Sequence, residues 1–314
     1  MGLPPLAVLR QTYMDKTLFS LSPEVESAHL SKKPIVALES TVIAHGLPRP
    51  QNIGTARRLE QIVKDAGAVP ATIAILNGQL RVGLSDEQTR FIAENDEIKK
   101  VSIRDLPIAS AQKWNGATTV ASTSWIAHRA GIKVFATGGI GGVHRGSLPD
   151  VSGDLPALAS TPIIVVCSGA KIVLDLPATR EWLETYGVTV LGYECDEMPA
   201  FYSRSSGLPI DVRVDSPADV AQIFQAQQAL GIESSLLVTV PVPAEFEVPA
   251  TDLERALNAA LREAESQHVG GRELTPFLLS RMAQISEGAT LKANIALLEN
   301  NARVAAQIAT ALQM

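Results

Sequence analysis

Short apolar runs alternate with longer helical patterns along most of this sequence, and the alternation limits the chain to few folds. Each run consists mainly of valine, isoleucine, leucine and alanine, and a glycine closes several of the helical patterns that follow. Such alternation predicts an α/β fold with a largely parallel central sheet covered by helices. The expected strands are residues 34–38, 71–76, 132–136, 163–166, 188–191 and 235–240.

The helical patterns lie between these strands and continue to the C-terminus. Asn77-Gly78 predicts a tight hairpin turn after the second strand. Because only 4% of the residues are aromatic, the core must be built from small and aliphatic side chains, as in a sheet covered by helices. No repeat or linker divides residues 34–314, which are expected to form a single large domain after an N-terminal extension, residues 1–33. The expected helices are residues 53–66, 86–95, 117–130, 171–186, 215–230, 253–267, 275–287 and 291–312.

Charge and composition exclude several classes of partner. The formal net charge of −6 is spread without a basic block, which argues against nucleic acid, because phosphate neutralisation needs clustered lysine and arginine. A small phosphorylated ligand needs only one local pocket and stays compatible. No apolar run reaches the roughly 18 residues of a membrane span. Cys167 and Cys195 lack metal-like spacing and fit a cytoplasmic compartment, and residues 1–33 give only weak support for organelle targeting.

A glycine-rich loop follows the strand at 132–136 and leads toward a lysine. Residues 137–146, TGGIGGVHRG, match neither a Walker loop nor a dinucleotide fingerprint. Their glycines could present backbone N–H groups to an anion, or could serve only a tight loop with positive φ. Lys171 follows the apolar strand at 163–166, where partial desolvation would favour the neutral, nucleophilic amine. The alternative is a surface lysine in the first turn of a helix.

Two aspartates lie between the loop and the lysine. Asp150 and Asp154, four residues apart around Ser152-Gly153, could supply oxygen ligands to a hard divalent cation. An ordinary turn followed by a helix cap has the same pattern, so both interpretations stay open.

Three further polar residues stand where a role is expected. Glu39 ends the apolar strand at 34–38, and a carboxylate there is costly unless it is paired, hydrogen-bonded or functional. It could act as a general acid or base, or cap the next helix. His144 is a candidate phosphate donor. Asn294 lies on a predicted helix where alanine would be more favourable, which implies a partner for its side chain.

Several long motifs occur together in one order. They are ALESTVIAHGLPRPQN, PATIAILNGQLRVGL, GATTVAST, VFATGGIGGVHRG, DVSGDL, CSGAKIVLDL, TPFLL and LKANIALLENNA. From about Pro34 to the C-terminus the chain resembles the pseudouridine-5′-phosphate glycosidase family. The resemblance implies a homotrimer of an α/β fold that uses a divalent metal, usually Mn²⁺. It also implies reversible cleavage of pseudouridine 5′-phosphate to uracil and ribose 5-phosphate.

The resemblance implies a role for each matching residue. Lys171 would be the nucleophile that forms a Schiff base with C1′ of the opened ribose, and Glu39 the proton donor. Asp150 would bind the metal. The remaining implied contacts are Ser152, Gly153 and Asp154 with substrate or metal-bound water, Lys100 and Val120 with the substrate pocket, and Thr137, His144 and Asn294 with phosphate or ribose.

The reaction makes chemical sense of these residue types. A carbon–carbon glycosidic bond has a poor leaving group, so an opened sugar joined to an amine, together with protonation of uracil at C5, eases its cleavage. The two-carboxylate template of ordinary glycosidases does not apply. The sequence departs from the family pattern at Ser168, where alanine is expected, at Ile103, where arginine is usual, and at Val240-Pro241, where Asn-Pro is expected.

Two other functions use the same residues. An aldolase-like Schiff-base lyase acting on another sugar phosphate would share the lysine but would not need uracil. A metabolite-binding protein without catalysis would bind pseudouridine 5′-phosphate and release no uracil. The joint presence of Glu39, Lys171 and Asp150 argues against the binding protein. Uracil-dependent consumption of ribose 5-phosphate would separate the glycosidase from the lyase.

Overall fold

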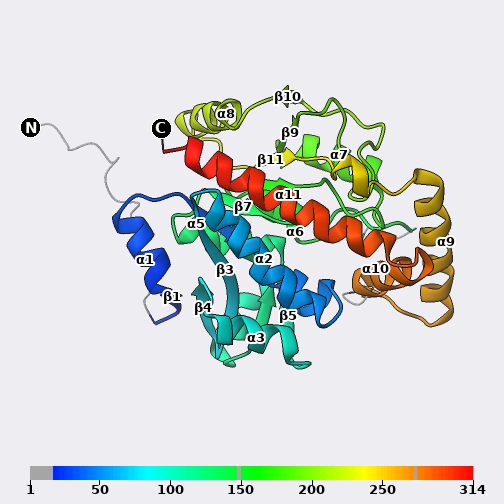
Figure 1. The fold of residues 1–314 in the computed structure, drawn as a ribbon, viewed down its shortest axis with the longest axis horizontal. Helices are drawn as coiled ribbons and strands as arrows, with labels where there is room; N and C mark the ends of the chain where they lie inside the picture. Colours follow the sequence, from blue (N-terminus) through cyan, green and yellow to red (C-terminus); the bar gives the residue numbers. More distant parts are fainter. Residues whose placement is uncertain (1–16, 147–149, 272–273, 314) are drawn as a thin grey trace, which may run out of the picture.

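A computed structural model describes residues 17–146, 150–271 and 274–313 (Figure 1). Its sheet has the order β1-β4-β3-β2-β7-β8-β11-β9-β10, with β6 beside β3 and β5 beside β6. All pairs are parallel except those of β3 with β4 and β6, which confirms the predicted, largely parallel sheet. The strands are β1 Phe19–Leu21, β2 Ile35–Leu38, β3 Val69–Leu76, β4 Gln79–Val82, β5 Lys99–Val101, β6 Gly116–Thr118, β7 Val134–Ala136, β8 Ile164–Cys167, β9 Thr189–Tyr193, β10 Val212–Val214 and β11 Leu236–Thr239.

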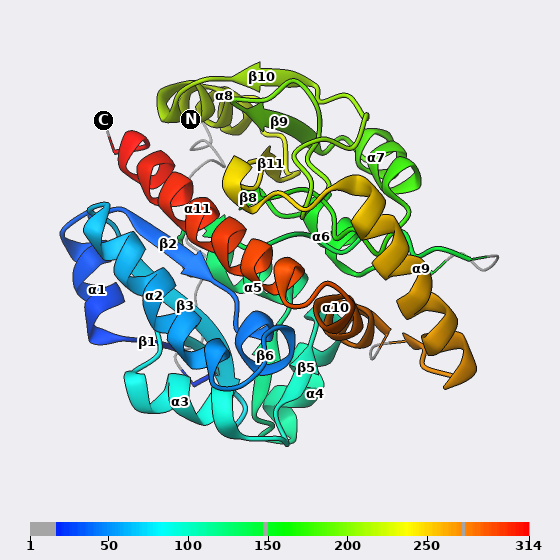
Figure 2. The same cartoon turned by 45° about the vertical axis from the view of Figure 1, so that its right-hand side comes forward.

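Helices cover both faces of the sheet. The long helix α11 crosses one face diagonally with α2 beside it (Figure 1), and it packs on β2, β7 and β8. From the other face α5 packs on the same region of the sheet, and α9 and α10 pair at one end of the molecule (Figure 2). The helices are α1 Pro23–Leu30, α2 Gln51–Asp65, α3 Asp86–Glu94, α4 Leu106–Ala111, α5 Val120–Arg129, α6 Asp154–Leu158, α7 Leu176–Thr185, α8 Pro217–Ala229, α9 Ala250–Ser266, α10 Leu274–Ile285 and α11 Ala289–Ala311.

The fold begins before the predicted domain start at Pro34. Strand β1 pairs in parallel with β4, and α1 buries Val25 and Ala28 completely or nearly so. Ser22 caps α1 by accepting the Val25 N–H at 3.3 Å, a favourable start for a short helix. Residues 17–33 therefore belong to the domain, and the rest of the predicted extension lies outside the described residues.

Two local predictions were wrong. Residues 116–118 form β6, not the start of a helix, because they pair with β3 and β5 and tertiary pairing overrides helical propensity in a small-residue segment. Helix α7 begins at Leu176, since Asp175 accepts the Ala178 N–H at 3.0 Å and Pro177 occupies its first turn. Lys171 consequently lies in a loop and not in a first helical turn.

The predicted hairpin turn is confirmed, and other local features agree with the predicted strands and helices. Asn77 and Gly78 both have positive φ in the turn between β3 and β4, as a tight hairpin turn requires. Ser85 forms a capping box at α3. Cys167 is fully buried in β8, and burial raises the pKa of its thiol to about 12. Among the described residues no helix is both long and apolar enough to cross a membrane.

Candidate active site

The strand order brings the predicted acid and nucleophile to one edge of the sheet. Strands β2, β7 and β8 are parallel neighbours, with Leu38 opposite Ala136 and Ala136 opposite Val166. Glu39 directly follows β2, and Lys171 lies in the loop that follows β8. Because carboxyl ends of parallel strands share an edge, side chains distant in sequence meet there, where ligands bind in open α/β sheets.

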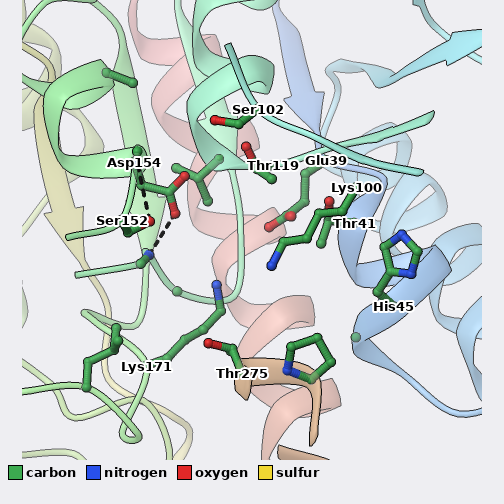
Figure 3. Close-up of a pocket in the computed structure, with 18 of the residues that line it drawn as sticks. Glu39, Thr41, His45, Lys100, Ser102, Thr119, Ser152, Asp154, Lys171 and Thr275 are labelled. Carbon is green, nitrogen blue, oxygen red and sulfur yellow. Dashed lines mark hydrogen bonds between the residues drawn. The ribbon is translucent and has the colours of Figure 1, made fainter. Parts of the chain in front are cut away.

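A cavity of about 680 Å³ opens at this edge, a volume suited to a small-molecule ligand. Figure 3 shows the Glu39 carboxyl group and the amino groups of Lys100 and Lys171 directed toward the same space. Every predicted site residue except Thr137 lines the cavity. These residues are Glu39, Lys100, Val120, His144, Asp150, Ser152, Gly153, Asp154, Lys171 and Asn294.

Glu39 is held below the cavity surface by the end of β7. Its side chain is 8% exposed, and the Thr137 hydroxyl donates a hydrogen bond to its carboxyl group. Burial raises the pKa of Glu39, although Lys171, the Thr137 hydrogen bond and Lys100 act in the opposite direction. The raised pKa favours the protonated form, which suits a proton donor. Thr137 thus contacts Glu39 and does not line the cavity.

The next residue fixes where β2 ends. Strand β3 pairs with β2 along its first half and with β6 along its second half. At the change of partner, the Ser40 hydroxyl donates to the Ile73 carbonyl at 2.7 Å and accepts the Thr118 N–H at 2.9 Å. These buried bonds anchor the backbone beside Glu39 and so orient its side chain into the opening between the strands.

The loop that carries Lys171 is tightly specified. Gly169 has φ of +80°, and a Cβ there would overlap the Pro199 carbonyl oxygen, so glycine is required. The Lys171 N–H donates to the Ile140 carbonyl at 3.1 Å. Within the described part of the chain, the Lys171 amino group makes no hydrogen bond or ion pair. It is available to a ligand in the cavity.

Asp154 uses both carboxylate oxygens to join two backbone segments. One oxygen accepts the Ala121 N–H at 2.9 Å. The other accepts the Gly141 N–H at 2.8 Å, which is one of the dashed lines at Asp154 in Figure 3. Its own N–H donates to Ser152 Oγ at 3.2 Å. A Cβ at Gly141 would overlap Ser152, so glycine is needed for this close approach. Asp154 lines the cavity but first holds the glycine-rich loop against the start of α5.

Asp150 is the exposed carboxylate at the cavity mouth. Its carbonyl accepts the His144 N–H at 2.8 Å, which places both residues side by side. Among the described residues, no group of three or more His, Cys, Asp or Glu side chains is arranged to hold a metal. Asp150 offers one exposed carboxylate, and a hard cation such as Mg²⁺ is often bound through only one or two carboxylates, with water and substrate oxygens completing its shell.

Two elements for which the sequence indicated no site role complete the cavity walls. Phe201 lines the cavity with φ of +64°, and its ring lies where a Cβ on Gly139 would come within 2.8 Å. Thr275, Pro276 and Leu279 of α10 form another wall. The TPFLL motif contains part of that wall, whereas an isolated phenylalanine after a proline-containing loop carries no sequence signal for such a position.

The fold and cavity define an α/β protein in which a lysine amine faces the same space as a buried carboxylic acid. Amine and acid together are the equipment of covalent and acid–base chemistry on small molecules. Residues 24–311 match the family described as indigoidine synthase A like protein.

Relatives and solved structures agree with this match. A pseudouridine-5′-phosphate glycosidase of Caldanaerobacter subterraneus subsp. tengcongensis is 50% identical over 93% of this chain and 96% of its own length. One of Geobacillus kaustophilus is 50% identical over 93% and 97%. An indigoidine synthase A-like protein of Thermotoga maritima, solved by crystallography, superposes with a TM-score of 0.87 at 38% identity over 95% and 97%.

A further crystal structure adds a ligand-bound neighbour. The prealnumycin C-glycosynthase AlnA in complex with ribulose 5-phosphate superposes with a TM-score of 0.86 at 39% identity, covering 94% of this chain and 97% of AlnA. The chain belongs to the family of indigoidine synthase A like proteins and pseudouridine-5′-phosphate glycosidases.

Proposed function

We propose that this protein is a pseudouridine-5′-phosphate glycosidase, which reversibly cleaves the carbon–carbon glycosidic bond of its substrate to give uracil and ribose 5-phosphate. The observation that carries the proposal is the shared cavity of Lys171 and the buried acid Glu39. Relatives of half-identical sequence bear this name, and a more distant neighbour binds a pentose phosphate. Both support a sugar phosphate as the ligand.

Lys171 begins the proposed reaction. Its neutral amine attacks C1′, a C1′–N bond forms, the C1′–O4′ bond breaks, and the proton lost by the new ammonium goes to O4′ as the ribose ring opens. The sugar is then tethered to the enzyme, and the nitrogen lone pair is placed to expel the base. Lys171 lies outside any helix, in a loop whose backbone conformation is fixed at Gly169. This position suits an amine that must reach a ligand in the cavity.

Glu39 then supplies the proton that carbon needs. As the uracil C5–C1′ bond breaks, its electrons take the Glu39 proton at C5, and the nitrogen lone pair forms an iminium at C1′. Water adds to the iminium and the C1′–N bond breaks, which frees ribose 5-phosphate and the neutral amine of Lys171, and the proton released returns to the Glu39 carboxylate. In synthesis the steps run backward, and the Glu39 carboxylate removes the proton from C5.

The remaining cavity residues bind the substrate in this proposal. Lys100 provides positive charge for the phosphate, His144 provides an N–H donor, and the Asn294 amide can bond to ribose hydroxyl groups or phosphate oxygens. Val120 gives an apolar part of the cavity wall, and Ser152 and Gly153 give further parts of it. Asp154 contributes mainly by fixing the loop that these residues share, because its oxygens are already bonded.

A metal, the assembly and the compartment complete the proposal. Asp150 would hold Mn²⁺ or another divalent cation at the cavity mouth, and a bound cation there supplies positive charge to a phosphorylated substrate. A homotrimer follows from the family resemblance, and sedimentation velocity tests it. A cytoplasmic location stays a prediction from composition.

One assay tests the function directly. The wild-type protein is incubated with pseudouridine 5′-phosphate and Mn²⁺, with and without chelator, and uracil is measured by chromatography. We expect uracil release that Lys171→Ala abolishes, while Lys33→Ala, which changes an exposed lysine, retains it. Circular dichroism checks that both variants are folded. Full activity in folded Lys171→Ala would remove the proposed nucleophile.

Trapping separates the proposed reaction from its alternatives. Borohydride adds hydride to an imine between Lys171 and ribose 5-phosphate and leaves the sugar attached as a secondary amine, which peptide mass spectrometry locates. An aldolase-like lyase would trap a sugar phosphate on Lys171 but release no uracil. A binding protein without catalysis would do neither.

A further inference from the structure

A buried asparagine lies beneath the cavity without lining it. Asn301 is fully buried in the middle of α11, where the helix packs on β7 and β8. Its buried neighbours along the helix are mainly alanine, leucine, valine and isoleucine. Asparagine is a poor helix former, and a buried amide is costly unless hydrogen-bonded. Its presence therefore requires specific partners.

Asn301 bonds to both loops that leave these strands. Its Nδ2 donates to the Thr137 carbonyl at 2.9 Å and to Ser168 Oγ at 3.1 Å. Ser168 Oγ in turn lies 3.3 Å from Asn301 Oδ1, as a donor to it. Thr137 and Ser168 are themselves buried. One amide thus spans the first residue after β7 and the first residue after β8.

The Thr137 carbonyl needs this partner because the ladder between the strands slips there. The Thr137 N–H donates to the Val166 carbonyl at 2.9 Å, so a regular parallel ladder would next pair the Ser168 N–H with the Thr137 carbonyl. The Ser168 N–H instead donates to the Gly138 carbonyl at 2.9 Å. This one-residue slip leaves the Thr137 carbonyl to Asn301. Bulges of this kind redirect side chains beside active sites.

The slip connects directly to the two reacting groups. Thr137 directs its hydroxyl to the Glu39 carboxyl group, and Ser168 opens the loop that ends at Lys171, three residues later. Beyond the slip, Ile140 and Gly169 continue the pairing at 3.0 Å. The register fixed at Thr137 and Ser168 therefore sets how the two loops lie relative to each other.

We propose that Asn301 is a positioning residue for the reaction: its amide stabilises the one-residue slip between the loops after β7 and β8, and so holds Glu39 and Lys171 in register. The proposal rests on the proposed function. Asn301 touches neither substrate nor reacting atoms and acts through Thr137 and Ser168.

The test compares Asn301→Ala with Asn300→Ala, the same change one position earlier. Asn300 is half-buried, donates to the Pro241 carbonyl at 3.4 Å and accepts from Arg303 at 2.9 Å, and among the described residues it has no hydrogen bond to either loop. The kcat and KM of uracil release are measured over a range of pH. The number of active sites is counted as the number of chains that borohydride and ribose 5-phosphate label, and kcat is expressed per labelled chain. Asn301→Ala is expected to lower kcat about 100-fold, the scale of a small misplacement of reacting groups, with KM within about threefold. Asn300→Ala is expected to stay within twofold of wild type.

The pH profile distinguishes positioning from general loss of structure. The Thr137 hydrogen bond lowers the pKa of Glu39 against the larger effect of burial. When Asn301→Ala releases Thr137, the fall in cleavage rate at high pH should move to higher pH. A variant that is merely less stable would lose active molecules and keep the wild-type profile, and this result overturns the proposal.

Further outcomes are assigned in advance. Folded Asn301→Ala with kcat within twofold of wild type also overturns the proposal. If that variant does not fold, Asn301→Ser, whose hydroxyl is too short to span both loops, is judged by the same criteria. If wild type releases no uracil, the proposed function fails. The rate of borohydride trapping then judges Asn301, with a tenfold slower rate in Asn301→Ala supporting it and an unchanged rate refuting it.

Discussion

Asp154 joins the glycine-rich loop to the start of α5, and replacing it by asparagine measures that connection. An asparagine has one carbonyl oxygen, so it can accept from either Ala121 or Gly141 but not from both. Its NH₂ group would face the other backbone N–H. A hydrogen bond to a charged group contributes about 1.5–3 kcal/mol, and the remaining bond would lose its charge. Loss of negative charge at the first turn of α5 adds about 0.3–1 kcal/mol.

Asp154→Asn should therefore lower the free energy of unfolding by about 2–4 kcal/mol. With a urea m-value of about 3 kcal/mol/M, the midpoint would fall by roughly 1 M. Urea titrations followed by circular dichroism, in chelator and in Mn²⁺, give this difference. Asp150→Asn is the matched control, because that side chain is exposed and its loss should change stability by no more than about 0.5 kcal/mol.

The Asp150→Asn and Asp154→Asn variants should also differ in how their activity and stability respond to metal. Asp150→Asn should weaken the response of uracil release to Mn²⁺ while the protein stays as stable as wild type. Asp154→Asn should be destabilised equally with and without metal. If Asp154→Asn unfolds within about 0.5 kcal/mol of wild type in chelator, its two backbone bonds contribute little, and its role would be that of a ligand.

Three other predictions follow from the site. Glu39→Gln should abolish uracil release. Because the pKa of Glu39 is raised in the folded protein, Glu39 stabilises the fold at low pH, and this contribution is lost as the pH rises through the raised pKa. At pH 8 the neutral glutamine side chain of Glu39→Gln avoids a buried charge, so the urea midpoint of this variant should equal or exceed that of wild type. A lower midpoint at pH 8 contradicts this. At saturating substrate, kcat for cleavage by wild type should fall as rising pH deprotonates Glu39, whereas kcat for synthesis from uracil should rise; parallel kcat profiles would exclude Glu39 as the shared acid and base. Gly169→Ala would place an alanine in a left-handed backbone conformation and its Cβ against the Pro199 carbonyl. The variant should therefore be less stable by at least about 1–2 kcal/mol, and borohydride should trap Lys171 more slowly. A trapping rate equal to that of wild type would refute this.

The sequence was sufficient for the layered architecture because its strands and helices carry strong local signals. Apolar runs such as 71–76 and the Ser85 capping box need no tertiary information. It was insufficient for β6, since Gly116-Ala117-Thr118 joins a small-residue segment and becomes a strand only by pairing with β3 and β5. The same holds for β1, whose pairing with β4 joins residues distant in sequence.

The site shows the same division. Motifs indicated which residues surround the cavity, and the structure brings all but Thr137 to its wall. Motifs could not indicate that Thr137 bonds to Glu39 or that Asp154 already uses both oxygens, because these are contacts between distant loops. Asn301 was inside a quoted motif, yet its meaning depends on a slip in a strand ladder that no local pattern records.

The position of the cavity follows from the order in which the strands enter the sheet. The chain passes from β2 through α2 to β3 on one side, and from β7 through α6 to β8 on the other. Neighbouring strands β2 and β7 thus send their connections in opposite directions, and a crevice opens where the connections part. Glu39 follows β2 on one side of that crevice, and Lys171 follows β8 on the other side, so a sugar bound between them can contact both side chains. An acid and an amine placed on consecutive strands of one half could not enclose a ligand in this way.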